Sequence, residues 1–210
     1  MKSNFKFPIS NFKYRCIVIG VSSGGMEALS VIIPALPSTF FLPVIIVQHI
    51  SPYSDNYMTR YLNDICKVTV KEVDEKEKIL PGFVYTAPPD YHVLVEDDET
   101  FSLSVEDRVN YARPSIDVLF ESAADVYGPT LVGVILTGAN NDGSLGMRRI
   151  KERGGLAIVQ NPETAEVGEM PKAAISAAPV DHILHLEEIG PFLVEIGSQI
   201  VVKKEFLEYK

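Results

Sequence analysis

The fold of this chain is decided by the stretch Cys16-Ile-Val-Ile-Gly-Val-Ser-Ser-Gly-Gly-Met-Glu-Ala-Leu29. Its first four residues form an unbroken, mostly β-branched apolar run, which is typical of a strand covered on both faces. Three glycines then permit a sharp turn and a close approach of the backbone. Helix-forming residues follow from Met26 to Leu36. The stretch therefore predicts a buried strand, a tight turn and a helix.

Two serines, Ser22 and Ser23, stand at the tip of this turn. The first turn of a helix presents unpaired N–H groups and the positive end of the helix dipole. A hydroxyl mounted there suits a nucleophile, and the same N–H groups suit a bound anion. The turn by itself leaves both possibilities open.

The rest of the chain alternates predicted strands and helices. Strands are predicted at residues 42–49, 67–73, 130–136, 156–160 and 182–186, and helices at 54–65, 114–127, 144–153, 171–178 and from 187 onward. Three short apolar runs between residues 83 and 105 are typical of an antiparallel hairpin or meander. The pattern predicts an α/β fold: a doubly wound, mostly parallel sheet in a three-layer αβα, Rossmann-like arrangement, with a small antiparallel hairpin portion.

Composition and charge exclude several classes of partner. The 210 residues carry a net charge of −9 without a basic cluster, so nucleic acid and anionic membrane surfaces are not expected as partners. No signal peptide is recognisable, and no apolar run reaches the ~20 residues of a membrane span. Cys16 and Cys66 are expected to be reduced thiols. We therefore expect a cytoplasmic protein without direct membrane insertion.

Three polar positions lie at or just past the ends of predicted buried strands: Ser22 with Ser23, His49 and Asp142. Ligands of an open parallel sheet bind outside the carboxyl ends of its strands, so the fold is expected to gather these side chains at one edge. A histidine can remove the proton of a serine hydroxyl, and an aspartate can orient the imidazole and stabilise the imidazolium. The sequence thus predicts nucleophilic catalysis at this edge.

Each of these residues also has a plainer interpretation. A Gly-rich turn before a helix can bind phosphate, a histidine can simply end a strand, and an aspartate before a helix can cap it. A dinucleotide-binding loop needs glycine where Ser22 stands. The nucleophile elbow of α/β-hydrolases fits Gly20-Val-Ser-Ser-Gly24, but their residue order is Ser, acid, His. The alternative to an enzyme is a non-catalytic anion- or nucleotide-binding module.

Five motifs together resemble one known family. They are Ile19-Gly-Val-Ser-Ser-Gly-Gly-Met-Glu-Ala28, Val47-Gln-His-Ile50, Tyr85-Thr-Ala-Pro-Pro-Asp-Tyr-His-Val-Leu-Val95, Ala112-Arg-Pro-Ser-Ile-Asp-Val-Leu-Phe120 and Val134-Ile-Leu-Thr-Gly-Ala-Asn-Asn-Asp-Gly143. With these motifs in this order, residues 16–189 resemble the chemotaxis protein-glutamate methylesterase family, CheB.

The resemblance implies a serine esterase that removes methyl groups from glutamate esters on the cytoplasmic helices of chemoreceptors. It also implies a possible deamidation of receptor glutamines. Matched motif by motif, Ser22 is the nucleophile, His49 the base and Asp142 the acid. The backbone N–H groups of Ser23 and Ala139 are the implied oxyanion donors. The implied chemistry requires no metal and no other cofactor.

The chain departs from the family pattern in two places. Many relatives have Met where Ala139 stands, which bears on the second oxyanion donor. Chemotaxis esterases usually carry an N-terminal receiver domain, and a lead-in of residues 1–14 is too short for one. We therefore expect one methylesterase domain at residues 15–200, a tail at 201–210 and no receiver domain. An esterase with a substrate other than a receptor stays open as an alternative.

Overall fold

The computed structural model describes residues 13–199. It contains a seven-stranded, wholly parallel sheet in the order β3-β4-β2-β1-β7-β8-β9. The strands are β1 (Cys16–Val21), β2 (Val44–Gln48), β3 (Thr69–Glu72), β4 (Phe83–Thr86), β7 (Leu131–Ile135), β8 (Leu156–Gln160) and β9 (His182–Leu184). The predicted lead-in and tail lie almost wholly outside the described residues, so the domain boundaries stay predictions.

The apolar run that opens the chain forms the central strand, β1. It pairs in parallel with β2 on one side and with β7 on the other. Its alternate side chains enter two different cores: Cys16 and Val18 pack on one face of the sheet, and Ile17 and Ile19 pack on the other. All six residues of the strand are buried, which explains why the run has no polar member.

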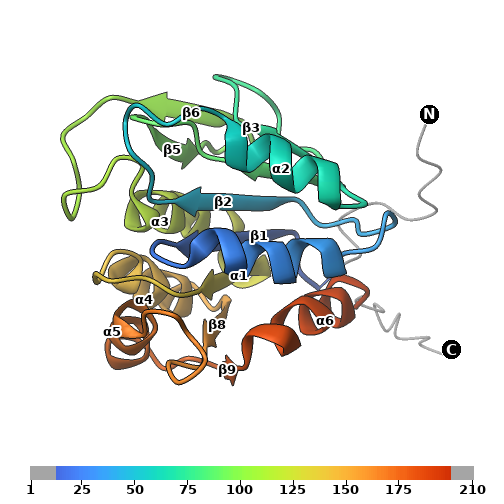
Figure 1. The fold of residues 1–210 in the computed structure, drawn as a ribbon, viewed down its shortest axis with the longest axis vertical. Helices are drawn as coiled ribbons and strands as arrows, with labels where there is room; N and C mark the ends of the chain where they lie inside the picture. The colour runs from blue at the N-terminus through green and yellow to red at the C-terminus, as the bar shows by residue number, and fades with distance from the viewer. Residues whose placement is uncertain (1–12, 200–210) are drawn as a thin grey trace, which may run out of the picture.

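Helices cover both faces of the sheet and complete three layers (Figure 1). One face is covered by α1 (Gly25–Ile32), α2 (Tyr57–Ile65) and α6 (Leu186–Gly197). The other face is covered by α3 (Ile116–Tyr127), α4 (Ser144–Glu152) and α5 (Glu169–Ala177). Two short 3₁₀ helices, η2 (Ile33–Ala35) and η3 (Gly128–Thr130), follow α1 and α3. The predicted αβα class is confirmed.

The antiparallel portion is a single hairpin of β5 (His92–Val95) and β6 (Phe101–Ser104). The expectation that the run at Phe83 belongs to this portion is wrong, because β4 lies in the main sheet between β3 and β2. The side chains of Val84 and Tyr85 enter opposite cores. Four residues are too few to distinguish a sheet-centre strand from one arm of a hairpin by sequence pattern.

Two helices begin later than their sequence patterns indicate. The α2 helix begins at Tyr57 instead of residue 54, and α3 begins at Ile116 instead of Pro114. Ser115 has extended dihedral angles at the N-cap of α3, and the Arg113–Pro114 peptide bond is cis. Ser115 therefore places the N–H groups that have no partner within α3 at a defined point, which matters for the site below.

The loops after β1, β2 and β7 meet at one edge of the sheet, on the left of Figure 1. This is the edge where the strands of a parallel sheet present their carboxyl ends. Within residues 13–199, none of the helices has the length and hydrophobicity that a bilayer span requires.

The contact between α3 and α4 is so close that it requires glycine. A Cβ atom at Gly146 would lie 2.4 Å from the Cβ of Phe120 and 3.3 Å from the backbone of Asp117. We predict that Gly146→Ala lowers the free energy of unfolding, because overpacking costs about 1–3 kcal/mol and helix propensity returns at most about 1 kcal/mol. Urea denaturation tests this prediction.

The matched control for this substitution is Arg148→Ala, on the exposed side of the same helix. Its free energy of unfolding should stay within about 0.5 kcal/mol of the wild type. Equal stability of Gly146→Ala and the wild type would contradict the close packing of α3 on α4.

Candidate active site

The carboxyl ends of β1, β2 and β7 bring together the three side chains singled out in the sequence. Val21 and Gln48 are paired residues at the ends of β1 and β2, so Ser22 and His49 emerge side by side. Ser22 Oγ lies 3.2 Å from His49 Nδ1, and His49 Nε2 lies 2.7 Å from Asp142 Oδ2. The three residues thus form one continuous chain of polar contacts.

The charge of Asp142 determines which atoms donate and which accept in this series of hydrogen bonds. An ionised carboxylate can only accept, so His49 Nε2 must carry the proton that it shares with Asp142. The other ring nitrogen, Nδ1, is then unprotonated and faces the hydroxyl of Ser22. Burial by itself would raise the pKa of Asp142, but hydrogen bonds from His49, Asn110 and the Ile116 N–H group hold it below its usual range.

Asp142 is completely shielded from solvent and is solvated by the protein instead. Four donors besides His49 reach its two oxygens: Ser115 Oγ at 2.9 Å, Asn110 Nδ2 at 3.0 Å, Ile116 N at 2.7 Å and Asp117 N at 3.1 Å. Two of these are backbone N–H groups in the first turn of α3. The helix dipole at this end favours a negative charge.

A second buried carboxylate, Asp117, lies behind the first. The amide nitrogen of Asn110 donates to both, at 2.9 Å from Asp117 Oδ2 and 3.0 Å from Asp142 Oδ1. The N–H group of Gly146 donates to the other oxygen of Asp117 at 2.7 Å. Burial raises the pKa of Asp117 to about 6, and the charge of Asp142 adds to the shift, against the hydrogen bond from Gly146.

The turn that carries Ser22 is fastened to both neighbouring loops. The N–H group of Ser22 donates to the carbonyl of Thr137 at 2.9 Å. The amide nitrogen of Gln48 donates to the carbonyls of Ser22 and His49, at 2.9 and 3.0 Å. Gly24 turns the chain with a φ of 78°, which only glycine adopts easily. Gln48 thereby holds the serine and histidine loops at a constant separation.

The N–H groups of Ser23 and Ala139 are the two predicted oxyanion donors. Within residues 13–199, neither donates a hydrogen bond to a protein acceptor. The loop that contains Ala139 packs directly on the serine, because a Cβ atom at Gly138 would lie 2.9 Å from Ser22 Cβ. Both N–H groups are therefore free to bind an oxygen of a ligand, and their role stays a prediction.

Asn140 is a site residue that the sequence analysis missed. Its Oδ1 accepts a hydrogen bond from the N–H group of Asp142 at 3.2 Å, which turns its amide nitrogen toward His49 Nδ1 at 3.4 Å. Gln48, Asn110 and Asp117 were missed as well. Three of these four residues lie inside the motifs quoted above, so their positions were a usable signal; Asn110 and its loop offered none.

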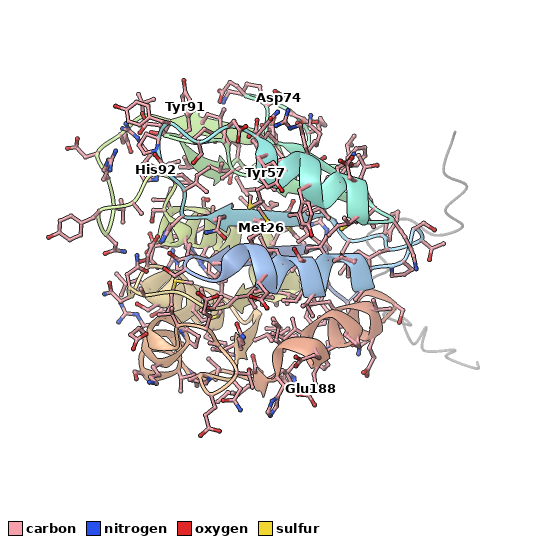
Figure 2. The ribbon with its side chains drawn as sticks, viewed as in Figure 1. Met26, Tyr57, Asp74, Tyr91, His92 and Glu188 are labelled. Carbon is pink, nitrogen blue, oxygen red and sulfur yellow. The ribbon has the colours of Figure 1, made fainter. Side chains whose placement is uncertain are left out.

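Two cavities meet at Ser22 and Ile50. The larger, of about 660 Å³, lies between α1 and α2 and is walled by Met26, Met58 and Tyr61, with Glu27 and Glu166 also lining it. Figure 2 shows Met26 on α1, on the face of the sheet that α2 also covers. The smaller, of about 360 Å³, is lined by His49, Asn140, Arg108, Tyr111 and Arg113, among others.

An αβα sheet whose strand-end loops join a serine, a histidine and a buried aspartate has the arrangement of a serine hydrolase. Comparison with known proteins agrees with this class and identifies a family within it. The family model described as CheB methylesterase matches residues 17–193. The catalytic domain of the Thermotoga maritima CheB methylesterase, a solved structure, superposes with a TM-score of 0.84 at 36% identity, covering 87% of this chain and 98% of that one. This chain belongs to the CheB methylesterase family.

Curated relatives carry names for two activities. A protein of Archaeoglobus fulgidus named protein-glutamate methylesterase/protein-glutamine glutaminase is 41% identical over 182 residues, covering 85% of this chain and 52% of the relative. A Leptospira interrogans protein with the same name, given provisionally, is 54% identical over 185 residues, covering 88% of this chain and 96% of the relative. The chain thus spans nearly all of one relative and about half of the other.

The raised pKa of Asp117 predicts a specific dependence of stability on pH. The folded chain binds this proton more tightly than the unfolded chain, so its contribution is complete below the ordinary aspartate pKa and is lost as pH rises through about 6. We therefore compare the free energies of unfolding of the wild type and of Asp117→Asn. The wild-type value minus the variant value should fall by up to roughly 3 kcal/mol between about pH 4 and pH 7. Urea denaturation across this range measures it.

Asp125→Asn is the matched control, with the opposite sign. Burial opposes the shift, but hydrogen bonds from Arg153 and Arg149 lower the pKa of Asp125. The corresponding difference should therefore stay nearly flat from pH 4 to pH 7 and fall only at pH values below the ordinary aspartate pKa. A difference for Asp117→Asn that stays flat from pH 4 to pH 7 would contradict a buried, proton-retaining carboxyl.

Proposed function

We propose that this chain is a protein-glutamate methylesterase that hydrolyses γ-methyl esters of glutamate through an acyl-enzyme on Ser22. The observation that carries the proposal is the unbroken contact chain from Ser22 Oγ through the imidazole of His49 to the buried Asp142. The family membership and the names of the relatives support the same reaction.

In the first half of the reaction, Ser22 Oγ attacks the ester carbonyl carbon while its proton passes to His49 Nδ1. The imidazolium that forms is stabilised by Asp142, which already holds the Nε2 proton. The negative oxygen of the tetrahedral intermediate binds the N–H groups of Ser23 and Ala139. Donors of this kind contribute several kcal/mol, because they are oriented before charge develops.

In the second half, the C–O bond to the leaving group breaks and methanol takes the proton from His49 Nδ1. Water then gives a proton to the same nitrogen and attacks the acyl-enzyme, which releases glutamate and restores the Ser22 hydroxyl. Every proton moves between Ser22, His49, water and the leaving group. The same acyl-enzyme forms from a glutamine side chain with ammonia as the leaving group, which supports glutamine deamidation as a second reaction, as the relatives' names suggest.

We further propose that the substrate is the methylated cytoplasmic region of a chemoreceptor. The CheB membership supports this choice, and the two free cysteines suit a reducing compartment. The cavities beside Ser22 open to solvent and are lined by both apolar and charged side chains, as binding of a protein segment requires. A protein ester outside chemotaxis is the competing substrate for the same chemistry.

Removal of the nucleophile should abolish the reaction. Ser22→Ala should lower kcat by about 10⁶ if the three residues act as a unit, and Asp142→Asn by roughly 10⁴. The measurement is methanol release from a methylated receptor fragment. Ser23→Ala is the matched control, because it removes the adjacent hydroxyl and keeps the backbone N–H group. Near-normal turnover by Ser22→Ala would exclude the acyl-enzyme.

Covalent labelling separates the esterase from an anion-binding module built on the same turn. A fluorophosphonate probe should label Ser22 in the wild type, and the label should be lost in His49→Ala, because the hydroxyl then lacks its base. Mass spectrometry of the labelled peptide identifies the site. A chain that stays unlabelled, but gains melting temperature with phosphate or nucleotide, would be a binding module.

A further inference from the structure

Two tyrosines beside the proposed active site are almost wholly exposed. Tyr53 exposes 97% of its surface and Tyr111 exposes 96%, whereas the other six tyrosines within residues 13–199 expose 57% or less. A single exposed aromatic residue needs no explanation. Two exposed tyrosines in loops of the same cleft do need an explanation, because tyrosine is enriched where proteins bind one another.

Both side chains belong to loops that border the smaller cavity. Tyr111 lines this cavity together with Ser22 and His49, and Tyr53 follows directly after Pro52, which also lines it. One loop follows β2, and the other connects β6 to α3. Figure 1 shows both loops beyond the carboxyl ends of the strands, where the proposed reaction takes place.

The backbone at Tyr111 has a left-handed conformation that tyrosine rarely adopts. Val109 and Ala112 exchange backbone hydrogen bonds of 3.2 and 2.9 Å across a two-residue turn, and Asn110 and Tyr111 have φ angles of 50° and 63°. Such turns favour asparagine or glycine at both central positions. Asn110 fits, and its amide points inward to the two carboxylates. Tyr111 does not fit, and its ring lies in solvent.

A cation on the same loop indicates what the surface binds. The Arg108 side chain is half exposed, and its ion pair with Asp90 is long, at 3.9 Å. Arg113, in contrast, donates to Asp90 and to two backbone carbonyls. Arg108 is therefore the loosely held positive charge of the cleft, and it suits a carboxylate carried by a partner.

We propose that Tyr53 and Tyr111, together with Arg108, dock the protein segment that carries the ester. This inference rests on the proposed function. A glutamate side chain is short, so the main chain of the substrate must pass directly over the cleft while its ester reaches Ser22. The partner is thus a protein segment with acidic side chains, which contacts two aromatic rings and one arginine beside the reacting ester.

The test compares a large and a small substrate of the same enzyme. The large one is the methylated cytoplasmic fragment of a chemoreceptor, and the small one is N-acetyl-glutamate γ-methyl ester amide. For Tyr111→Asn and Tyr53→Ser, the ratio of kcat/KM on the fragment to kcat/KM on the small ester should fall about tenfold or more. Arg108→Gln should lower the same ratio and weaken its dependence on salt.

Three controls separate docking from folding. Tyr111→Asn should melt no lower than the wild type, because asparagine tolerates the left-handed backbone. Tyr111→Phe keeps the ring and should keep the ratio. Ile183→Ser removes another exposed large side chain, 48% exposed, on the edge strand β9, and should leave the ratio unchanged.

The remaining outcomes would overturn either the docking surface alone or the proposed function together with it. An unchanged ratio in both tyrosine variants would overturn the docking surface, as would an equal fall for Ile183→Ser. A wild-type chain that hydrolyses the small ester alone would also overturn it, and would leave the esterase chemistry intact. Hydrolysis of neither ester by the wild type would reject the proposed function, and the docking surface with it.

Discussion

The site depends on one electrostatic constraint: Asp142 must stay ionised while it is shielded from water. Burial of a carboxylate costs several kcal/mol unless hydrogen bonds and charges replace its hydration. Here five donors do so: His49, Asn110, Ser115 and the first two N–H groups of α3. The position of the N-terminus of α3 is therefore a requirement of the chemistry, and the rest of the fold has to hold it there.

The packing of α3 connects this charge to the hydrophobic core. Its first turn solvates Asp142, and its next polar side chain, Asp117, is fastened to α4 through the N–H group of Gly146. The close approach of Phe120 to Gly146 fixes the separation of the two helices. A loosened helix contact would thus affect Asp142, the proposed catalytic carboxylate, without any change in a residue proposed to touch the substrate.

Much of this arrangement could be predicted from the sequence, because it rests on local patterns and one topological rule. The sequence predicts the apolar run of β1, the glycine turn and the strand-end positions of Ser22, His49 and Asp142. The neighbours of Asp142 could not be predicted, because Asn110 and the N–H groups of α3 reach it only through loop and helix-start geometry. The position of β4 in the main sheet could not be predicted for a similar reason, since a run of four residues does not show which strands pair with it.

The loop that contains residues 109–112 contacts the proposed catalytic carboxylate on one side and solvent on the other. In the turn at residues 109–112, consecutive side chains point in opposite directions: Asn110 bonds two buried carboxylates, and Tyr111 lies in solvent. The inward hydrogen bonds of Asn110 hold the turn in this geometry, which accounts for the unfavourable backbone at Tyr111. The proposed reaction centre and the proposed docking surface are therefore joined by two adjacent residues. Any change that relaxes the turn would disturb the charge of Asp142 and the presentation of Tyr111 together.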